Sequence, residues 1–166
     1  MLFRSPIMGA VLNVERVSLL NVMAASRHCF EDLVTFLKEN KPDALKNPAI
    51  RQRLSQQIVE FNVTRGLQYQ VAWMEDQGLD CTSPASMYKI LSGDCLRHVT
   101  DLAMELLGPY SQLLPDSWRV PLEGRIPVTY LDSFGWSLGG GTHEIQRNII
   151  ARRGLQLPSE RTRITQ

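Results

Sequence analysis

The stretch SPASMYKILSGDCLRHVTDLAMELLG, residues 83–108, gives the clearest indication of fold class in this sequence. Apolar residues recur along it at steps of three and four, at Tyr88, Leu91, Cys95, Val99, Leu102 and Leu106. Such steps place side chains on one face of an α-helix. Ser83 before Pro84 is typical of a helix start, and Gly108 is typical of a helix end. The stretch therefore predicts a long amphipathic helix.

A second long helix is predicted upstream of the first. Asn47 before Pro48 again resembles a cap followed by a proline in the first turn, and Gly78 is placed to end the helix. The apolar face of this helix is expected at Ile50, Leu54, Ile58 and Phe61. Before it, the sequence predicts a loop over residues 41–48 and a first long helical segment over residues 9–40.

The C-terminal part of the chain predicts shorter elements. Residues 109–127 contain four prolines and no periodicity, so a long loop is expected there. Helices are predicted over residues 128–138 and, after three glycines, over 142–154, followed by a flexible polar tail over 158–166. No segment alternates as a strand does. The sequence thus predicts an all-α, up-down helical bundle in one domain, residues 1–157.

Composition narrows the class of protein. The chain has 166 residues and 43% hydrophobic content, enough for a single domain with a core of its own. Its net charge of +1 favours neither nucleic acid nor a membrane surface as partner. The three cysteines, Cys29, Cys81 and Cys95, form no CxxC pair, which is typical of a reducing interior. We expect a soluble, cytoplasmic protein without a membrane span.

The stretch GGGTHEIQRNIIARRG, residues 139–154, is the first candidate site. Thr142 is placed to cap the helix, and Glu144 lies in its first turn, where a carboxylate suits the positive end of the helix dipole. Three glycines ahead of a helix expose backbone N–H groups that can donate hydrogen bonds to an anion, a polar cofactor edge or a carbonyl oxygen. A tight turn between two helices is the alternative explanation.

Other motifs are sparse. The histidines, His28, His98 and His143, form no HxxxH or HExxH pair, so no metal site is predicted. Glu15 lies in the apolar stretch LNVERVSLL with only Arg16 as a charged neighbour. In such a setting the pKa of a carboxyl rises, and the group can act as a base. A surface glutamate on a polar stripe is the alternative.

Three of these stretches together resemble the acyl-CoA dehydrogenase family. GGGTHEIQRNIIARRGLQLP is similar to the C-terminal signature of that family, LNVERVSLL to the start of its C-terminal helical domain, and LAMELLG to its Gln-x-x-Gly-Gly stretch. The resemblance implies an FAD enzyme that desaturates an acyl-CoA thioester between its α and β carbons. A glutamate takes the α proton, and the β hydrogen leaves as hydride to the flavin. An electron-transfer acceptor and a homo- or hetero-oligomer are also implied.

The resemblance assigns roles to individual residues. Most family members carry the catalytic glutamate where this chain has Gly140, but one branch places it on the first helix of the domain, where this chain has Glu15. Arg16 is then expected by the thioester, and the backbone of Gly141 near the substrate carbonyl. The residues expected to contact FAD are Gly108, Gly140, Thr142, His143 and Glu144.

The chain also departs from the family pattern. Glu105 replaces the expected glutamine, and Pro109 replaces the second glycine, which removes a backbone N–H from the pyrophosphate contact. Such departures resemble actinobacterial branches that act on steroid or other bulky thioesters, some of them built from unlike subunits. The 166 residues resemble only the C-terminal domain and not the family's N-terminal helical and middle β domains, as expected of a fragment of a longer chain or of a stand-alone C-terminal half that needs a partner. We therefore expect the chain alone to bind FAD poorly and to be inactive. A non-catalytic binding or assembly subunit is the alternative.

Overall fold

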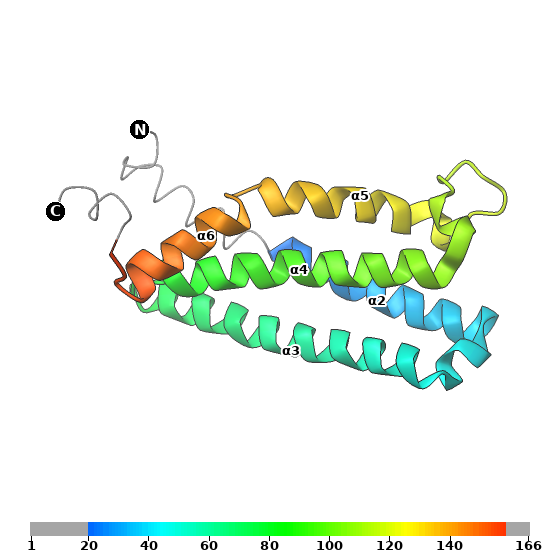
Figure 1. The fold of residues 1–166 in the computed structure, drawn as a ribbon, viewed down its shortest axis with the longest axis horizontal. Coiled ribbons are helices and arrows are strands. Elements are labelled where there is room, and N and C mark those ends of the chain that lie inside the picture. Colours follow the sequence, from blue (N-terminus) through cyan, green and yellow to red (C-terminus); the bar gives the residue numbers. More distant parts are fainter. Residues whose placement is uncertain (1–19, 159–166) are drawn as a thin grey trace.

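The computed structural model describes residues 20–158 of the chain and shows an elongated bundle of helices (Figure 1). The α-helices are α2 (Leu20–Asn40), α3 (Pro48–Asp76), α4 (Thr82–Leu107), α5 (Arg125–Leu138) and α6 (His143–Ile149). Three short 3₁₀ helices and one π-helical turn complete them: η2 (Pro42–Lys46), η3 (Gly108–Gln112), η4 (Pro121–Gly124) and η5 (Ile150–Gly154). No strand occurs between residues 20 and 158, which confirms the predicted all-α fold.

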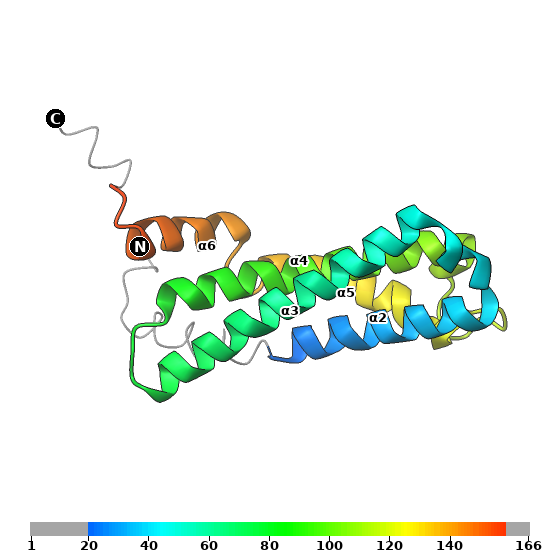
Figure 2. The ribbon, with the colours of Figure 1, turned by 90° about the horizontal axis from the view of Figure 1, so that it is seen from below.

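Helix α4 is the centre of the bundle. It lies between α3 and α5 in Figure 1, and α2 and α6 also pack against it. Figure 2, seen from below, shows α2 and α3 meeting at η2. The predicted apolar face of α4 is largely confirmed, since Tyr88, Cys95, Val99 and Leu102 are buried. The central part of the buried core therefore follows α4, with Val22 of α2 packed near its N-terminal half.

The face of α3 was predicted only in part. Asn47 caps the helix as expected, because its side chain accepts the N–H of Ala49 at 2.9 Å. Leu54 is buried, but Ile58 is 48% exposed, so its assignment to the core was wrong. A four-residue step overshoots a full helical turn by about 40°, and two such steps carry Ile58 off the buried line. That line continues through the polar side chain of Gln57 instead.

The starts of two helices and the structure of two loops differ from those predicted. Helix α4 begins at Thr82, whose N–H is accepted by the Asp80 carboxylate at 2.9 Å, so Ser83 is not its cap. The predicted loops 41–48 and 109–127 contain 3₁₀ turns, and α5 begins three residues early, at Arg125. Pro127 is tolerated there because the N–H groups of a first helical turn need no partner within the helix.

The C-terminal helix is also subdivided, since a π-helical turn follows α6 from Ile150 to Gly154. The predicted helical stretch over residues 9–19 and most of the predicted tail lie outside the described residues.

Substitutions in α3 test which residues belong to the core. We expect Leu54→Ala to lower the free energy of unfolding by about 2 to 3 kcal/mol, because it opens a cavity beside buried side chains. Ile58→Ala on the same helix is expected to cost about 1 kcal/mol or less, because its side chain is half in solvent. Urea denaturation of both variants measures the difference, and equal losses would contradict the assigned face.

Candidate functional site

The three glycines that join α5 to α6 have distinct backbone conformations. Gly139 has a φ of −57°, which any residue can adopt, whereas Gly140 and Gly141 have φ values of +66° and +98°. The last two therefore occupy backbone space that favours glycine. We call residues 139–141 the glycine turn. The backbone conformation of the turn thus favours glycine at positions 140 and 141 but not at position 139.

Helix α6 begins as predicted. Thr142 is its N-cap, and the Thr142 side chain accepts the N–H of Ile145 at 3.5 Å. Glu144, in the first turn, is exposed. A hydrogen bond from its own backbone N–H, and then one from Thr142, hold the pKa of the Glu144 carboxyl below its usual range. Both residues thus serve the helix start in this structure, and neither role excludes a further ligand.

Gln146 is the residue of this region that the sequence did not reveal. Its side chain is fully buried, and its Nε2 donates to Gly140 O at 2.7 Å and to Gly141 O at 3.3 Å. Its Oε1 is buried without a hydrogen-bond partner in the described structure. A glutamine in the middle of a short polar helix gives no sequence signal for such a position. The side chain reaches back beneath the glycine turn and holds two of its carbonyl groups.

The backbone N–H groups of the glycine turn are not equivalent. Gly139 N–H donates to Gly135 O at 2.9 Å, and Gly141 N–H donates to Leu138 O at 3.2 Å. Within residues 20–158, no acceptor is present for the N–H of Gly140. A Cβ added to Gly140 would meet no atom of residues 20–158 within 4 Å, so this part of the chain leaves the space beside it open. Gly140, rather than Gly141, therefore has a backbone donor available for a ligand.

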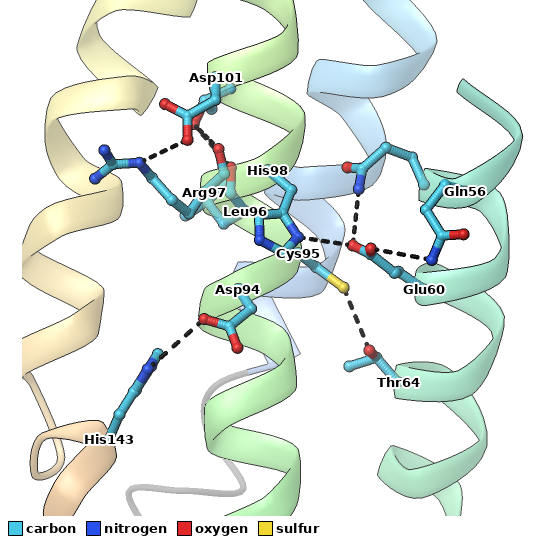
Figure 3. Close-up of polar contacts among 12 residues, drawn as sticks. Gln56, Glu60, Thr64, Asp94, Cys95, Leu96, Arg97, His98, Asp101 and His143 are labelled. Carbon is cyan, nitrogen blue, oxygen red and sulfur yellow. Dashed lines mark hydrogen bonds and ion pairs between the residues drawn. The ribbon is translucent and has the colours of Figure 1, made fainter. Parts of the chain in front are cut away.

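His143 faces α4. Its Nδ1 lies 3.6 Å from Asp94 Oδ1, as Figure 3 shows, and its Nε2 is buried without a partner among the described residues. A Cβ added to Gly93 would lie 3.6 Å from that Nε2, so the small residue on α4 makes room for the ring. His143 thus attaches the start of α6 to α4.

A buried lysine supports the other side of the turn. Lys89 of α4 is only 2% exposed, and its Nζ donates to Ser137 O at 3.2 Å. Ser137 lies in the last turn of α5, where backbone carbonyls lack partners within the helix and attract a cation. Lys89 therefore ties the C-terminal end of α5, just before the glycine turn, to the central helix. The sequence analysis did not single out this residue.

Gly108 lies at the other end of the bundle. It ends α4 with a φ of +70°, about 22 Å along the helix from Gly93, which touches His143. Figure 1 shows η3 and α6 near opposite ends of α4. Close to Gly108, Arg53 pairs with Glu105 at 2.7 Å and lowers the pKa of that carboxyl. The residues expected around FAD therefore form two separate groups.

Several other predicted features can be placed. Cys29, Cys81 and Cys95 are buried, and burial raises the pKa of the Cys29 thiol to about 12. Figure 3 shows Cys95 beside Thr64, and the carboxylate of Glu60 beside His98 at 3.0 Å.

In the described part of the chain, no cluster of His, Cys, Asp and Glu could hold a metal ion. Among the described helices, none has the length and apolar character needed to cross a bilayer. The two remaining site residues, the predicted base and its neighbouring arginine at positions 15 and 16, lie outside the described residues.

Comparison with known proteins points to one family. The model for the C-terminal domain of acyl-CoA dehydrogenases matches residues 5–155. The acyl-CoA dehydrogenase IpdE1 of Mycobacterium tuberculosis is 33% identical over 122 residues, which cover 70% of this chain and 29% of that protein. Two solved structures share the fold, the Tcur3481-Tcur3483 steroid ACAD (TM-score 0.82, 23% identity, 90% and 38% of the two chains) and the ChsE4-ChsE5 complex of Mycobacterium tuberculosis (0.74, 23%, 82% and 36%). The chain thus spans about a third of the length of these proteins.

Alanine substitutions along the glycine turn test its geometry. We expect Gly139→Ala to change the free energy of unfolding by about 0.5 kcal/mol or less, since its φ is ordinary. Gly140→Ala is expected to cost about 1 to 2 kcal/mol from its positive φ alone. Gly141→Ala is expected to cost more, at least about 2 kcal/mol, because its Cβ would also lie 3.0 Å from Gln146 Nε2. Urea unfolding gives the order, and a costly Gly139 variant would contradict it.

Proposed function

Because this chain belongs to the acyl-CoA dehydrogenase family, as its C-terminal helical domain, we propose that it supplies part of an FAD enzyme that desaturates an acyl-CoA thioester. The observation that carries the proposal is the free N–H of Gly140, in an open space beside the start of α6. A thioester carbonyl is an acceptor of the right kind for such a donor. A hydrogen bond there stabilises the negative charge that develops on the carbonyl oxygen when the α proton leaves.

The base in this proposal is Glu15. The position that most family members use for the base is Gly140 here, so a carboxylate must come from elsewhere in the chain. Glu15 matches the alternative position by resemblance, and its carboxylate would take the α proton. Arg16 would lie by the thioester. A glycine at position 140 leaves room for the acyl group, in keeping with the finding that no atom of the described residues lies within 4 Å of a Cβ placed there.

The residues present also fit a flavin. When bound, FAD supplies the acceptor for the hydride from the β carbon. The flavin would lie beside the glycine turn and the start of α6, which offer space and polar groups. The residues there are Gly140, Thr142, His143 and Glu144. Gly108, at the other end of α4, would contact a second flavin or the far part of a cofactor, since it lies too far away to share the first group's contacts.

Partner domains are part of the proposal. Helix α3 exposes Val59, Val63 and Trp73, and α5 exposes Leu131 and Leu138, each more than half in solvent. Apolar surfaces of this kind are usually covered by another domain or subunit. The chain spans about a third of its relatives, and the ChsE4-ChsE5 structure is a complex of two proteins. We propose a homo- or hetero-oligomer that passes electrons to a separate acceptor and takes a steroid or other bulky acyl group, while the chain alone is inactive.

A non-catalytic assembly subunit is the second candidate. The replacement of glutamine and glycine by Glu105 and Pro109, next to Gly108, favours it, because both changes weaken contact with a pyrophosphate. Pairing with Arg53 reduces the charge effect of Glu105 but does not restore the lost N–H. The two candidates differ in what they require of Glu15, since only the enzyme needs its carboxylate.

A fusion protein tests the proposed function. The full 166-residue chain would replace the corresponding C-terminal region of the Mycobacterium tuberculosis relative, and FAD absorbance would be followed after addition of an acyl-CoA. We expect the fusion to retain FAD and to be bleached by the substrate, and Glu15→Gln to bind both while losing bleaching at least about 10³-fold, because the base is removed without a change of shape. Glu31→Gln is the control, because the Glu31 side chain is exposed on α2, and the FAD of this fusion should be bleached at the wild-type rate.

Two results would contradict parts of this proposal. Bleaching by the Glu15→Gln fusion at the control rate would favour the assembly subunit. Tight, stoichiometric FAD binding and reduction by the isolated chain would contradict its proposed dependence on other domains.

A further inference from the structure

Gln146 is a polar residue whose side chain is completely buried. Its side chain is 0% exposed, yet its Oε1 has no partner within the described structure. A buried amide with an unsatisfied acceptor destabilises a protein, and an apolar side chain of the same length would avoid that cost. The part of the amide that does bind is the Nε2 group, and both of its contacts go to the glycine turn. The contribution of Gln146 is therefore to be sought in that turn.

The contacts of Gln146 fix one peptide plane from two sides. Gly140 C=O and Gly141 N–H belong to the same peptide unit, which is planar. The carbonyl accepts from Gln146 Nε2 at 2.7 Å, and the N–H donates to Leu138 O at 3.2 Å. Since this unit is held at both ends, the direction of the Gly140 N–H depends on the two backbone torsions of Gly140, its ψ and its φ, the latter being +66°.

The preceding residue narrows the remaining freedom. Gly139 N–H donates to Gly135 O at 2.9 Å, so the chain is also tied to α5 immediately before Gly140. The N–H of Gly140 lies between these two hydrogen-bonded N–H groups, and within residues 20–158 it has no acceptor. Without the Gln146 amide, only the Gly141 to Leu138 bond would hold the plane, and glycine has wide conformational freedom.

We propose that Gln146 is a positioning residue, which clamps the peptide between Gly140 and Gly141 and thereby aims the N–H of Gly140 at the thioester carbonyl. This inference rests on the proposed function. It assigns Gln146 a role through Gly140 and no contact with the substrate. Small errors in the position of such a donor have large effects on rate, because its bond is strongest when charge develops in the transition state.

The matched variants are Gln146→Met and Asn148→Met. Methionine has nearly the length of glutamine and removes both the donor and the unsatisfied acceptor. Asn148 is an exposed amide on the same helix, so its variant controls for the loss of an amide from α6. If Gln146→Met fails to fold, Gln146→Glu serves in its place, because it keeps the shape and replaces the donating group with an oxygen.

The first measurement uses the full 166-residue chain and amide hydrogen exchange by NMR. The clamp predicts that Gln146→Met speeds exchange of the Gly141 N–H at least about tenfold relative to amides of α4, because the turn opens locally. The Asn148→Met chain should exchange as the wild type does. Unchanged exchange at Gly141 in the Gln146 variant would overturn the clamp, whatever the function of the protein.

The second measurement uses the FAD-loaded fusion and the CoA thioester of a steroid side-chain acid, labelled with ¹³C at its carbonyl. In the wild type, the C=O stretch of the bound thioester should lie below that of the free thioester, since a hydrogen bond weakens the carbonyl bond. Gln146→Met should move the stretch back toward the free value and lower kcat about ten- to a hundredfold while KM stays within about threefold.

A purely structural role would leave the carbonyl stretch unchanged, so a wild-type stretch and kcat in the Gln146 variant would overturn the inference and leave the proposed function standing. A wild-type fusion that neither shifts the carbonyl nor reduces FAD would instead overturn both.

Discussion

Burial of α4 along its whole length is the constraint on which the other elements depend. Its apolar face packs against α2 and α3, its other sides receive α5 and α6, and side chains such as Leu102 and Val99 have almost no exposed surface. Because α4 is fixed by these neighbours, groups attached to its N-terminal half are fixed as well. Gly93 and Asp94 hold His143 at the start of α6, and Lys89 holds the end of α5. The elements on both sides of the glycine turn, the end of α5 and the start of α6, are therefore held by residues of the same helix, α4.

Three largely buried polar side chains lie around that turn. Gln146, Lys89 and His143 are all largely buried, and each contacts backbone or a charged group close to residues 139–143. Buried polar atoms without a partner lower stability, and among the described residues Gln146 Oε1 and His143 Nε2 are two such atoms. These side chains surround a short backbone segment in which the N–H of Gly140 has no acceptor within residues 20–158. The opposite end of α4, near Gly108, has instead an exposed ion pair, Arg53 and Glu105.

The sequence was informative where local chemistry determines local structure. Asn47 and Thr142 cap their helices as predicted, Gly108 ends α4, and the steps of three and four on α4 identify its buried side. It failed where the outcome depends on a neighbour. Ile58 continues an apolar pattern but faces solvent, because the line of contact between α3 and α4 passes through Gln57. A propensity or periodicity argument cannot anticipate which polar residue a partner helix will cover.

The site was predictable to a similar extent. The glycines and the N-cap were found from residue type and spacing, since only glycine adopts these φ values at low cost. Gln146 and Lys89 were not found, because their importance arises from contacts between elements far apart in the sequence or from a turn that folds back on its own helix. The role of Glu15 is a proposal that comes from resemblance to the family, and it requires Glu15 to lie near Gly140.

A spin label tests that placement most directly. A nitroxide attached to a cysteine introduced at position 15 would label the full chain selectively, because Cys29, Cys81 and Cys95 are buried. If Glu15 lies near Gly140, the label should broaden the amide NMR signals of Gly140 and Gly141 and leave that of Gly108, at the far end of α4, sharp. Broadening of Gly108 with unaffected signals from the glycine turn would show that the carboxylate and the turn do not share a site.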